Sequence, residues 1–291
     1  MEKKFAFFLG CTIPASQFHV EAATRKAFEK LGVELLDMEG ATCCSDPEIS
    51  RQFDENLWLH IAARNISIAE KLNANIMTVC NGCFDTLNKV NESLKSDEKL
   101  KNEVNRDLEA IGKEYKGTVK VLHAIEVLHD EIGLDTISKA VVKPLKNLRV
   151  ALQPGCRLYH DDEKKLVEKF TALVKALGAQ IIDYPLIRLC CGVPALYVDA
   201  EFSLMERTKK KLESIQSVNV DCIVTFCPAC YDRLEKGQLD LRSRGINFDI
   251  PILNYFELLA LALGIDPDDF GMYLHRIPAD VVVEKIEEET A

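Results

Sequence analysis

The sequence lacks any long apolar run. Its two most apolar stretches, FAFFLG (5–10) and FELLALALG (256–264), fall far short of what a membrane requires. A membrane-spanning helix needs about 20 such residues, and the first stretch is also too short for the core of a signal peptide. We therefore expect no membrane insertion and a cytoplasmic protein, a setting in which structural disulfides are uncommon.

Two common cofactor motifs are also missing. The sequence has no glycine-rich dinucleotide fingerprint and no C-x-x-C-x-x-C-x-x-x-C run, so we expect no flavin, no nucleotide and no ordinary relay cluster in this chain. Electrons for any redox reaction must then come from another protein. The sequence also lacks an excess of basic residues, because the net charge is −10. Nucleic acid is thus excluded as the main partner, although a local basic pocket can still bind an anionic small molecule.

Cysteine, by contrast, is abundant. Ten of the eleven cysteines form two sets of five, and each set has a lone cysteine, a vicinal pair and a C-x-x-C. In both sets the vicinal pair lies 36 positions before the C-x-x-C. The first cysteine set is Cys11, Cys43, Cys44, Cys80 and Cys83, and the second cysteine set is Cys156, Cys190, Cys191, Cys227 and Cys230.

Other residues repeat together with the cysteines. FEKLGVELLD (28–37) matches VKALGAQIID (174–183), and residues 121–135 match residues 252–266. The sequence therefore predicts two pseudo-symmetric domains, 1–145 and 146–291. A charged helical insertion at about 91–117 occurs in the first domain alone.

The apolar pattern predicts an α/β fold. Short apolar runs that end near the cysteines alternate with helical patterns closed by glycine, which is typical of βαβ units. Each repeat should thus form a small parallel sheet flanked by helices, with cysteines at the carboxyl ends of the strands, where such sheets bind ligands.

Three kinds of chemistry use cysteines in this way. Zinc needs four thiolates and would leave one cysteine of each set over. Dithiol exchange needs a single C-x-x-C and would leave three. Iron–sulfur clusters are held by thiolates from several converging segments, and a larger or distorted cluster would use all five. We favour iron–sulfur, and the spacing alone leaves the other two open.

At this point the motifs carry a family resemblance. A lone cysteine, a Cys-Cys-Gly and a C-x-x-C about 36 residues later resemble the CCG domain, and the resemblance covers residues 5–265. This domain is found twice in the B subunit of heterodisulfide reductase and also in components of glycolate oxidase and succinate:quinone reductase.

The resemblance implies a catalytic iron–sulfur subunit that reduces the coenzyme M–coenzyme B heterodisulfide to two thiols. Each CCG domain of that family holds a noncubane [4Fe-4S] cluster, and the substrate is cleaved between the two clusters. The first cysteine set would hold cluster 1 and the second would hold cluster 2. The alternative is an electron-transfer subunit of a glycolate- or lactate-oxidising or succinate:quinone reductase-type complex.

The resemblance also implies partners and substrate contacts. The partners would be the small ferredoxin-like subunit and the flavin-bearing subunit of the same complex, with a hydrogenase or a formate dehydrogenase upstream. The family's disulfide carries sulfonate, carboxylate and phosphate groups, so cations near the cysteines could bind it. The candidates are Arg157, Arg188 and Arg233, and His160 is the candidate proton donor.

Two further residues carry expectations. Cys222 has no counterpart in the first repeat and should be a buried core residue. The first vicinal pair departs from the family pattern, because it is followed by Ser45 where the second is followed by Gly192. Since glycine allows backbone conformations that serine adopts rarely, the two sites should differ in shape.

Overall fold

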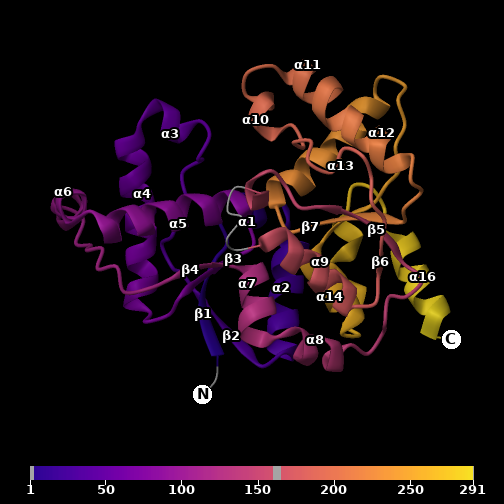
Figure 1. Ribbon diagram of the computed structural model, residues 1–291, viewed down its shortest axis with the longest axis horizontal. Helices are drawn as coiled ribbons and strands as arrows, with labels where there is room; N and C mark the ends of the chain where they lie inside the picture. The colour runs from indigo at the N-terminus through magenta and orange to yellow at the C-terminus, as the bar shows by residue number, and fades with distance from the viewer. Residues whose placement is uncertain (1–2, 160–164, 291) are drawn as a thin grey trace. The chain divides into compact units, whose positions relative to one another are not determined.

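The computed structural model describes residues 3–159 and 165–290 and has the expected α/β fold. It contains two four-stranded sheets in which every strand pairing is parallel (Figure 1). The strands come in the same order in both sheets, so the predicted repeat is a repeat of structure as well as of sequence.

The first sheet has the order β2-β1-β3-β4. Its register places Phe5 of β1 opposite Leu35 of β2, and Ala6 of β1 opposite Ile76 of β3. The strands are β1 (Lys3–Phe8), β2 (Val33–Asp37), β3 (Ile76–Thr78) and β4 (Val121–His123).

The second sheet has the order β6-β5-β7-β8. Ala151 of β5 lies opposite Ile223 of β7, and Val224 lies opposite Leu253 of β8. The strands are β5 (Arg149–Gln153), β6 (Gln180–Ile181), β7 (Cys222–Thr225) and β8 (Ile252–Asn254). Cys222 is fully buried within β7, which confirms the expectation of a core residue.

The chain forms two compact units, and their limits differ from a simple division into halves. Unit 1 comprises residues 1–16 and 32–127, and unit 2 comprises residues 17–31 and 128–291. Helix α2 (Phe18–Lys30) therefore belongs to unit 2, where it packs on α14 (Tyr255–Ala262). The rings of Phe28 and Phe256 lie 5.2 Å apart in this contact. The repeat boundary at residues 145 and 146 stays a prediction.

Unit 1 surrounds its sheet with helices that follow the strands. Helix α6 lies in the predicted insertion, where Val104, Leu108 and Tyr115 are buried, so the segment is not wholly solvated. The helices are α1 (Thr12–Ser16), α3 (Ser50–Phe53), α4 (Glu55–Lys71), α5 (Asn81–Ser96), α6 (Glu98–Glu109) and α7 (Ala124–Glu126), and the π-helix η1 (Val127–Ile132) spans the unit boundary.

Unit 2 contains a second π-helix, η3 (Ser203–Lys209), between α11 and α12. Such π-helical turns occur often at functional sites. The other helices, apart from α2 and α14, are α8 (Leu134–Ala140), η2 (Arg157–Tyr159), α9 (Leu166–Ala176), α10 (Val193–Leu196), α11 (Ala200–Phe202), α12 (Lys210–Gln216), α13 (Pro228–Arg242), α15 (Pro267–Phe270), η4 (Met272–Leu274) and α16 (Asp280–Thr290).

The repeat extends to the helix caps after the fourth strands. His123 caps α7 and Asn254 caps α14, and in each case a glutamate three residues later accepts a hydrogen bond from the N–H of the capping residue. This reciprocal capping box satisfies backbone groups that the helix itself leaves unpaired. The repeated residues Glu126 and Glu257 thus have a shared structural role.

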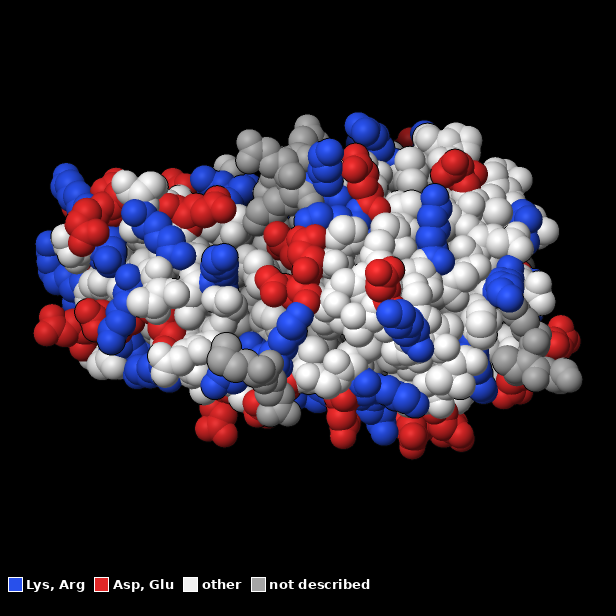
Figure 2. Space-filling view, turned by 60° about the horizontal axis from the view of Figure 1, so that its bottom comes forward, with Lys and Arg blue, Asp and Glu red and all other residues white. Residues whose placement is uncertain are grey.

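The surface carries both signs of charge. Figure 2 shows basic and acidic side chains interspersed over one face of the molecule. Within the described residues, none of the helices is long and apolar enough to cross a membrane.

Candidate metal centres

The first cysteine set gathers at the carboxyl edge of the first sheet. Cys11 follows β1, the vicinal pair follows β2, and Cys80 and Cys83 begin α5 directly after β3. Hydrogen bonds between neighbouring side chains connect the thiols in the order Cys11, Cys43, Cys44, Cys83 and Cys80. Cys11 and Cys43 are exposed whereas Cys44 and Cys83 are buried, so the set reaches from the surface into the unit.

The second cysteine set repeats this arrangement. The Cys190 thiol forms side-chain hydrogen bonds with Cys156 and with Cys191. The Sγ atoms of Cys191 and Cys230 lie 3.4 Å apart, and Cys230 in turn meets Cys227. The structure joins none of these ten cysteines in a disulfide. The structure therefore brings together the five members of each predicted set.

Two glycines beside the cysteine sets allow close approaches that a side chain would block. At Gly10, where φ is +74°, a Cβ atom would lie 2.8 Å from the Sγ of Cys83. At Gly192, where φ is +113°, a Cβ would lie 2.9 Å from the Oγ of Ser203. The backbone N–H of Gly192 in turn donates a hydrogen bond of 3.5 Å to the Sγ of Cys190. Only glycine fits such close approaches without strain.

The crowded sulfurs shift one another's ionisation. A hydrogen bond from the Cys43 thiol lowers the pKa of Cys44 to about 6, and hydrogen bonds from Cys156 and Cys191 lower the pKa of Cys190 to about 2. Hydrogen bonding to Cys191 and burial raise the pKa of Cys230. The surroundings of Cys44 and Cys190 thus favour the thiolate, and thiolate is the form in which cysteine binds metals.

The N-termini of two helices, α5 and α13, lie at these sites. Cys80 is the N-cap of α5 and Cys227 is the N-cap of α13. Because the helix dipole places partial positive charge at the N-terminus, both positions favour anionic sulfur. The C-x-x-C pairs therefore occupy positions at which thiolates are stabilised.

The arginines named from the sequence differ in their surroundings. Arg188 is exposed, and its guanidinium lies 4.8 Å from the ring centre of Tyr159. Arg157 is half-buried in η2. Arg233 is buried, and its Nε donates a hydrogen bond of 2.9 Å to Thr208, whose hydroxyl donates to the carbonyl of Cys191. His160 lies outside the described residues.

One cation near the second set was not expected from the sequence. Arg207 of η3 lies close enough to Cys190 to help lower the pKa of that thiol. Its guanidinium lies 5.0 Å from the ring centre of Phe202. Spacing could not have identified it, because it lies 16 positions after Cys191 and belongs to the π-helical turn η3.

The sequence also assigned no role to a buried network in unit 2. The Tyr231 hydroxyl lies 3.1 Å from Nε2 of His19 and 3.1 Å from Nδ1 of His275, and Nε2 of His275 lies 2.7 Å from Glu257. Burial lowers the pKa of His275, but the Glu257 carboxylate outweighs burial and the net shift is upward. Burial likewise raises the pKa of Glu257, and His275 more than offsets it. The network therefore contains a buried ion pair.

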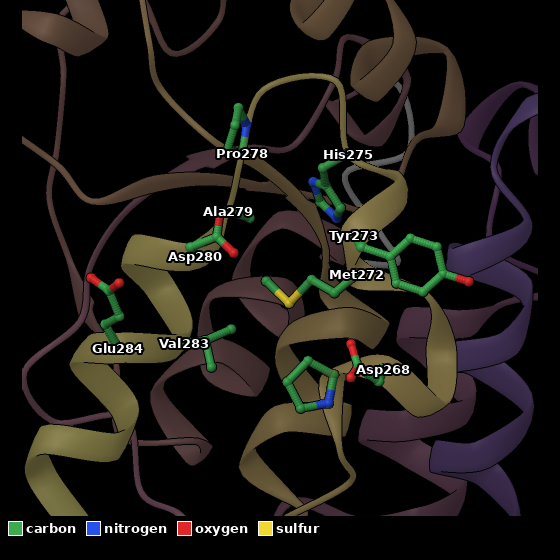
Figure 3. Close-up of a pocket in the computed structure, with 10 residues that line it drawn as sticks. Asp268, Met272, Tyr273, His275, Pro278, Ala279, Asp280, Val283 and Glu284 are labelled. Carbon is green, nitrogen blue, oxygen red and sulfur yellow. The ribbon is translucent and has the colours of Figure 1, made fainter.

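A pocket of about 430 Å³ lies beside this network. Figure 3 shows that α15, η4 and α16 line it, with Met272 pointing into its centre and His275 on one wall. Its carboxylates are Asp268, Asp280 and Glu284, so it suits no anionic ligand.

Comparisons with known proteins agree with this geometry. The cysteine-rich domain family CCG matches the chain twice, at residues 5–88 and 150–235. A solved structure of a hypothetical protein from Helicobacter pylori has a similar fold, with a TM-score of 0.75 at 14% identity, over 95% of this chain and 52% of that one. The chain is therefore a two-domain member of the CCG family of cysteine-rich, iron–sulfur proteins.

Curated relatives narrow the family further. The chain is 38% identical to the B subunit of the ferredoxin/F420H2-dependent CoB–CoM heterodisulfide reductase of Methanosarcina acetivorans, over 99% of this chain and 98% of that protein. It is 35% identical, with the same coverage, to the B subunit of the ferredoxin:CoB–CoM heterodisulfide reductase of Methanosarcina mazei. It is also 30% identical to the 8-methylmenaquinol:fumarate reductase membrane anchor subunit of Wolinella succinogenes, over 96% of this chain and 99% of that protein. The chain belongs to the family of heterodisulfide reductase B subunits, which are oxidoreductases.

Proposed function

We propose that each cysteine set holds one noncubane [4Fe-4S] cluster. The observation that carries this proposal is the convergence of five cysteine thiols at the sheet edge of each repeat. Four thiolates suffice for an ordinary cubane, and the fifth cysteine of each set would be a further ligand to a larger or distorted cluster. Zinc would leave one of these crowded thiols without a metal.

The proposed reaction is the reduction of the coenzyme M–coenzyme B heterodisulfide. Breaking one S–S bond consumes two electrons and two protons and yields two thiols. When bound, the two clusters supply the electrons one at a time, and this requirement gives a physical reason for the duplicated site. The proposal is supported by the relatives named as heterodisulfide reductase subunits.

This chain's own cations would bind the anionic groups of the substrate. Arg188 is exposed and precedes Cys190 by two positions, and Arg207 is half-buried near Cys190, so we propose both as anion contacts. Arg157 remains a third candidate. The buried guanidinium of Arg233 instead supports the Cys191 backbone through Thr208. We keep His160 as the proposed proton donor.

The partners follow from the same assignment. We propose a cytoplasmic complex with a ferredoxin-like subunit and a flavin-bearing subunit, and with a hydrogenase or formate dehydrogenase upstream. The names of two relatives include ferredoxin, and one of them also includes F420H2, which supports electron delivery from a separate redox carrier.

The alternative is an electron-transfer subunit whose partner chain performs the chemistry, in a glycolate- or lactate-oxidising or succinate:quinone reductase-type complex. The similarity to a fumarate reductase subunit favours it. The two are separated by assaying anaerobically prepared protein with reduced viologen and the heterodisulfide. Release of two thiols per disulfide by this chain alone supports catalysis, whereas a protein that takes up electrons but releases no thiol supports the alternative.

A further inference from the structure

Lys211 of α12 is a fully buried cation with neutral partners. Its side chain is 0% exposed. Its Nζ donates hydrogen bonds to the carbonyls of Leu186 and Ile187, at 2.9 and 3.2 Å, and to the Tyr184 hydroxyl at 3.3 Å. Among the described residues, no carboxylate lies within ion-pair distance of it. A buried ammonium without a countercharge is costly, so this position calls for an anion nearby.

A continuous line of hydrogen bonds connects Lys211 to the second cysteine set. The Tyr184 hydroxyl donates its one proton between the Leu152 carbonyl at 2.9 Å and Oε1 of Gln153 at 3.2 Å. Nε2 of the same Gln153 amide donates to the Sγ of Cys230 at 3.6 Å. Tyr184 and Gln153 are both buried. The ammonium therefore orients the hydroxyl, and the hydroxyl orients the amide that donates to a sulfur.

The second cysteine set lies close enough to Lys211 to affect the pKa of its ammonium. Burial lowers the pKa of Lys211 to about 8, and Cys230, Cys191, Cys190 and Cys156 oppose that shift. A cluster held by these cysteines would place its negative charge in the same position.

The first repeat lacks this line of residues. Arg64 stands where Lys211 does, 21 positions after the first vicinal cysteine, but it is half-buried and donates to the carbonyl of Gly40. Phe8 stands where Gln153 does, three positions before the lone cysteine. A phenyl ring cannot donate a hydrogen bond to sulfur, and a partly solvated guanidinium is screened by water and salt.

We propose that Lys211, acting through Tyr184 and Gln153, gives cluster 2 a higher reduction potential than cluster 1. This proposal rests on the proposed function, since it requires a cluster in each repeat. In each one-electron step a reduced ferredoxin-type donor is oxidised and the accepting cluster gains one negative charge. A buried positive charge and an N–H···S hydrogen bond both stabilise that charge. The first electron therefore resides on cluster 2.

The test is a redox titration of the iron-loaded protein, followed by electron paramagnetic resonance. In the Lys211→Met variant we expect the reduction potential of one cluster to fall by at least about 59 mV, which is a tenfold change in its one-electron equilibrium constant. The potential of the other cluster should stay unchanged. Gln153→Leu should lower the same potential. Arg64→Met is the matched control and should change the one-electron equilibrium constant of cluster 2 by less than tenfold. A variant with Cys80→Ser and Cys83→Ser, which keeps the second set, identifies the affected cluster.

The outcomes separate the two proposals. Unchanged potentials in a fully iron-loaded Lys211→Met variant, or an equal fall in Arg64→Met, would overturn the role of Lys211 and leave the clusters in place. Wild-type protein without iron would overturn the proposed function itself. If Lys211→Met does not fold, Tyr184→Phe decides, because it removes only the hydroxyl that joins the ammonium to Gln153.

Discussion

Ser45 and Gly192 occupy the same position in the two repeats, directly after the vicinal cysteines, and both have positive φ, at 68° and 113°. The carbonyl of Ser45 accepts a hydrogen bond from Thr86, which holds the serine in this unfavourable conformation. Both repeats therefore have a positive φ at this position although the residue differs, and the strain falls on the first site alone.

This relationship predicts that a substitution at Gly192 is destabilising whereas a substitution of Ser45 by glycine has little effect. Gly192→Ala places a Cβ 2.9 Å from the Oγ of Ser203 and 3.0 Å from its carbonyl oxygen, so we expect a loss of about 2 kcal/mol in the free energy of unfolding and of the second iron site. Ser45→Gly relieves the left-handed serine and should change stability by less than about 1 kcal/mol. Iron analysis and denaturant unfolding check both. Equal behaviour of the two variants would contradict the account.

The arginines should separate into binding and supporting residues. Arg188→Gln and Arg207→Gln should each raise KM for the anionic disulfide about tenfold, since a charged hydrogen bond contributes about 1.5–3 kcal/mol, and should leave stability unchanged. Arg233→Gln should lower the free energy of unfolding by about 1–3 kcal/mol because it leaves Thr208 without its buried donor. Steady-state kinetics and unfolding of the three variants test this. An Arg233→Gln variant of normal stability with a raised KM would reverse the assignment.

The buried pair of Glu257 and His275 should make stability depend on pH. The raised pKa of His275 means that its contribution is complete below the unfolded value of 6.5 and is lost as pH rises through the folded pKa. The lowered pKa of Glu257 means that its contribution is present above 4.5 and is lost as pH falls through the folded pKa. The pair therefore stabilises the fold most between these two unfolded values.

Glu257→Gln tests this dependence. We expect a loss of about 3 kcal/mol near pH 6, because the variant leaves a buried imidazolium unpaired, and a smaller loss at high pH. The control is His129→Gln, which removes a partly exposed pair with Asp130 and should cost less than about 1 kcal/mol. Unfolding curves over this pH range give the measurement, and a loss that does not vary with pH would contradict the pairing.

The fold and the cysteine sets could be predicted because both depend on local pattern. Strand runs ending near matched cysteines already indicate one edge of a parallel sheet. The position of α2 could not be predicted, because Val20, Ala23 and Ala27 form an apolar face that fits any sheet or helix. Their packing on α14 is decided by tertiary structure.

Lys211 shows the same limit more sharply. It lies in a run of three lysines, 209–211, a pattern that ordinarily indicates a solvated helix face. Only the fold shows that the third lysine points inward to Tyr184 while its neighbours form ion pairs with Glu206 and Glu213 at the surface. Spacing relates residues along the chain, and burial depends on what packs against them.

The central claim is one cluster in each repeat, and iron with acid-labile sulfide on anaerobically purified protein tests it most directly. The account predicts about eight irons per chain, as two four-iron clusters require. About four should remain when Cys80 and Cys83, or Cys227 and Cys230, are replaced by serine. Stoichiometric zinc with little iron, or about four irons in the unaltered chain, would contradict it.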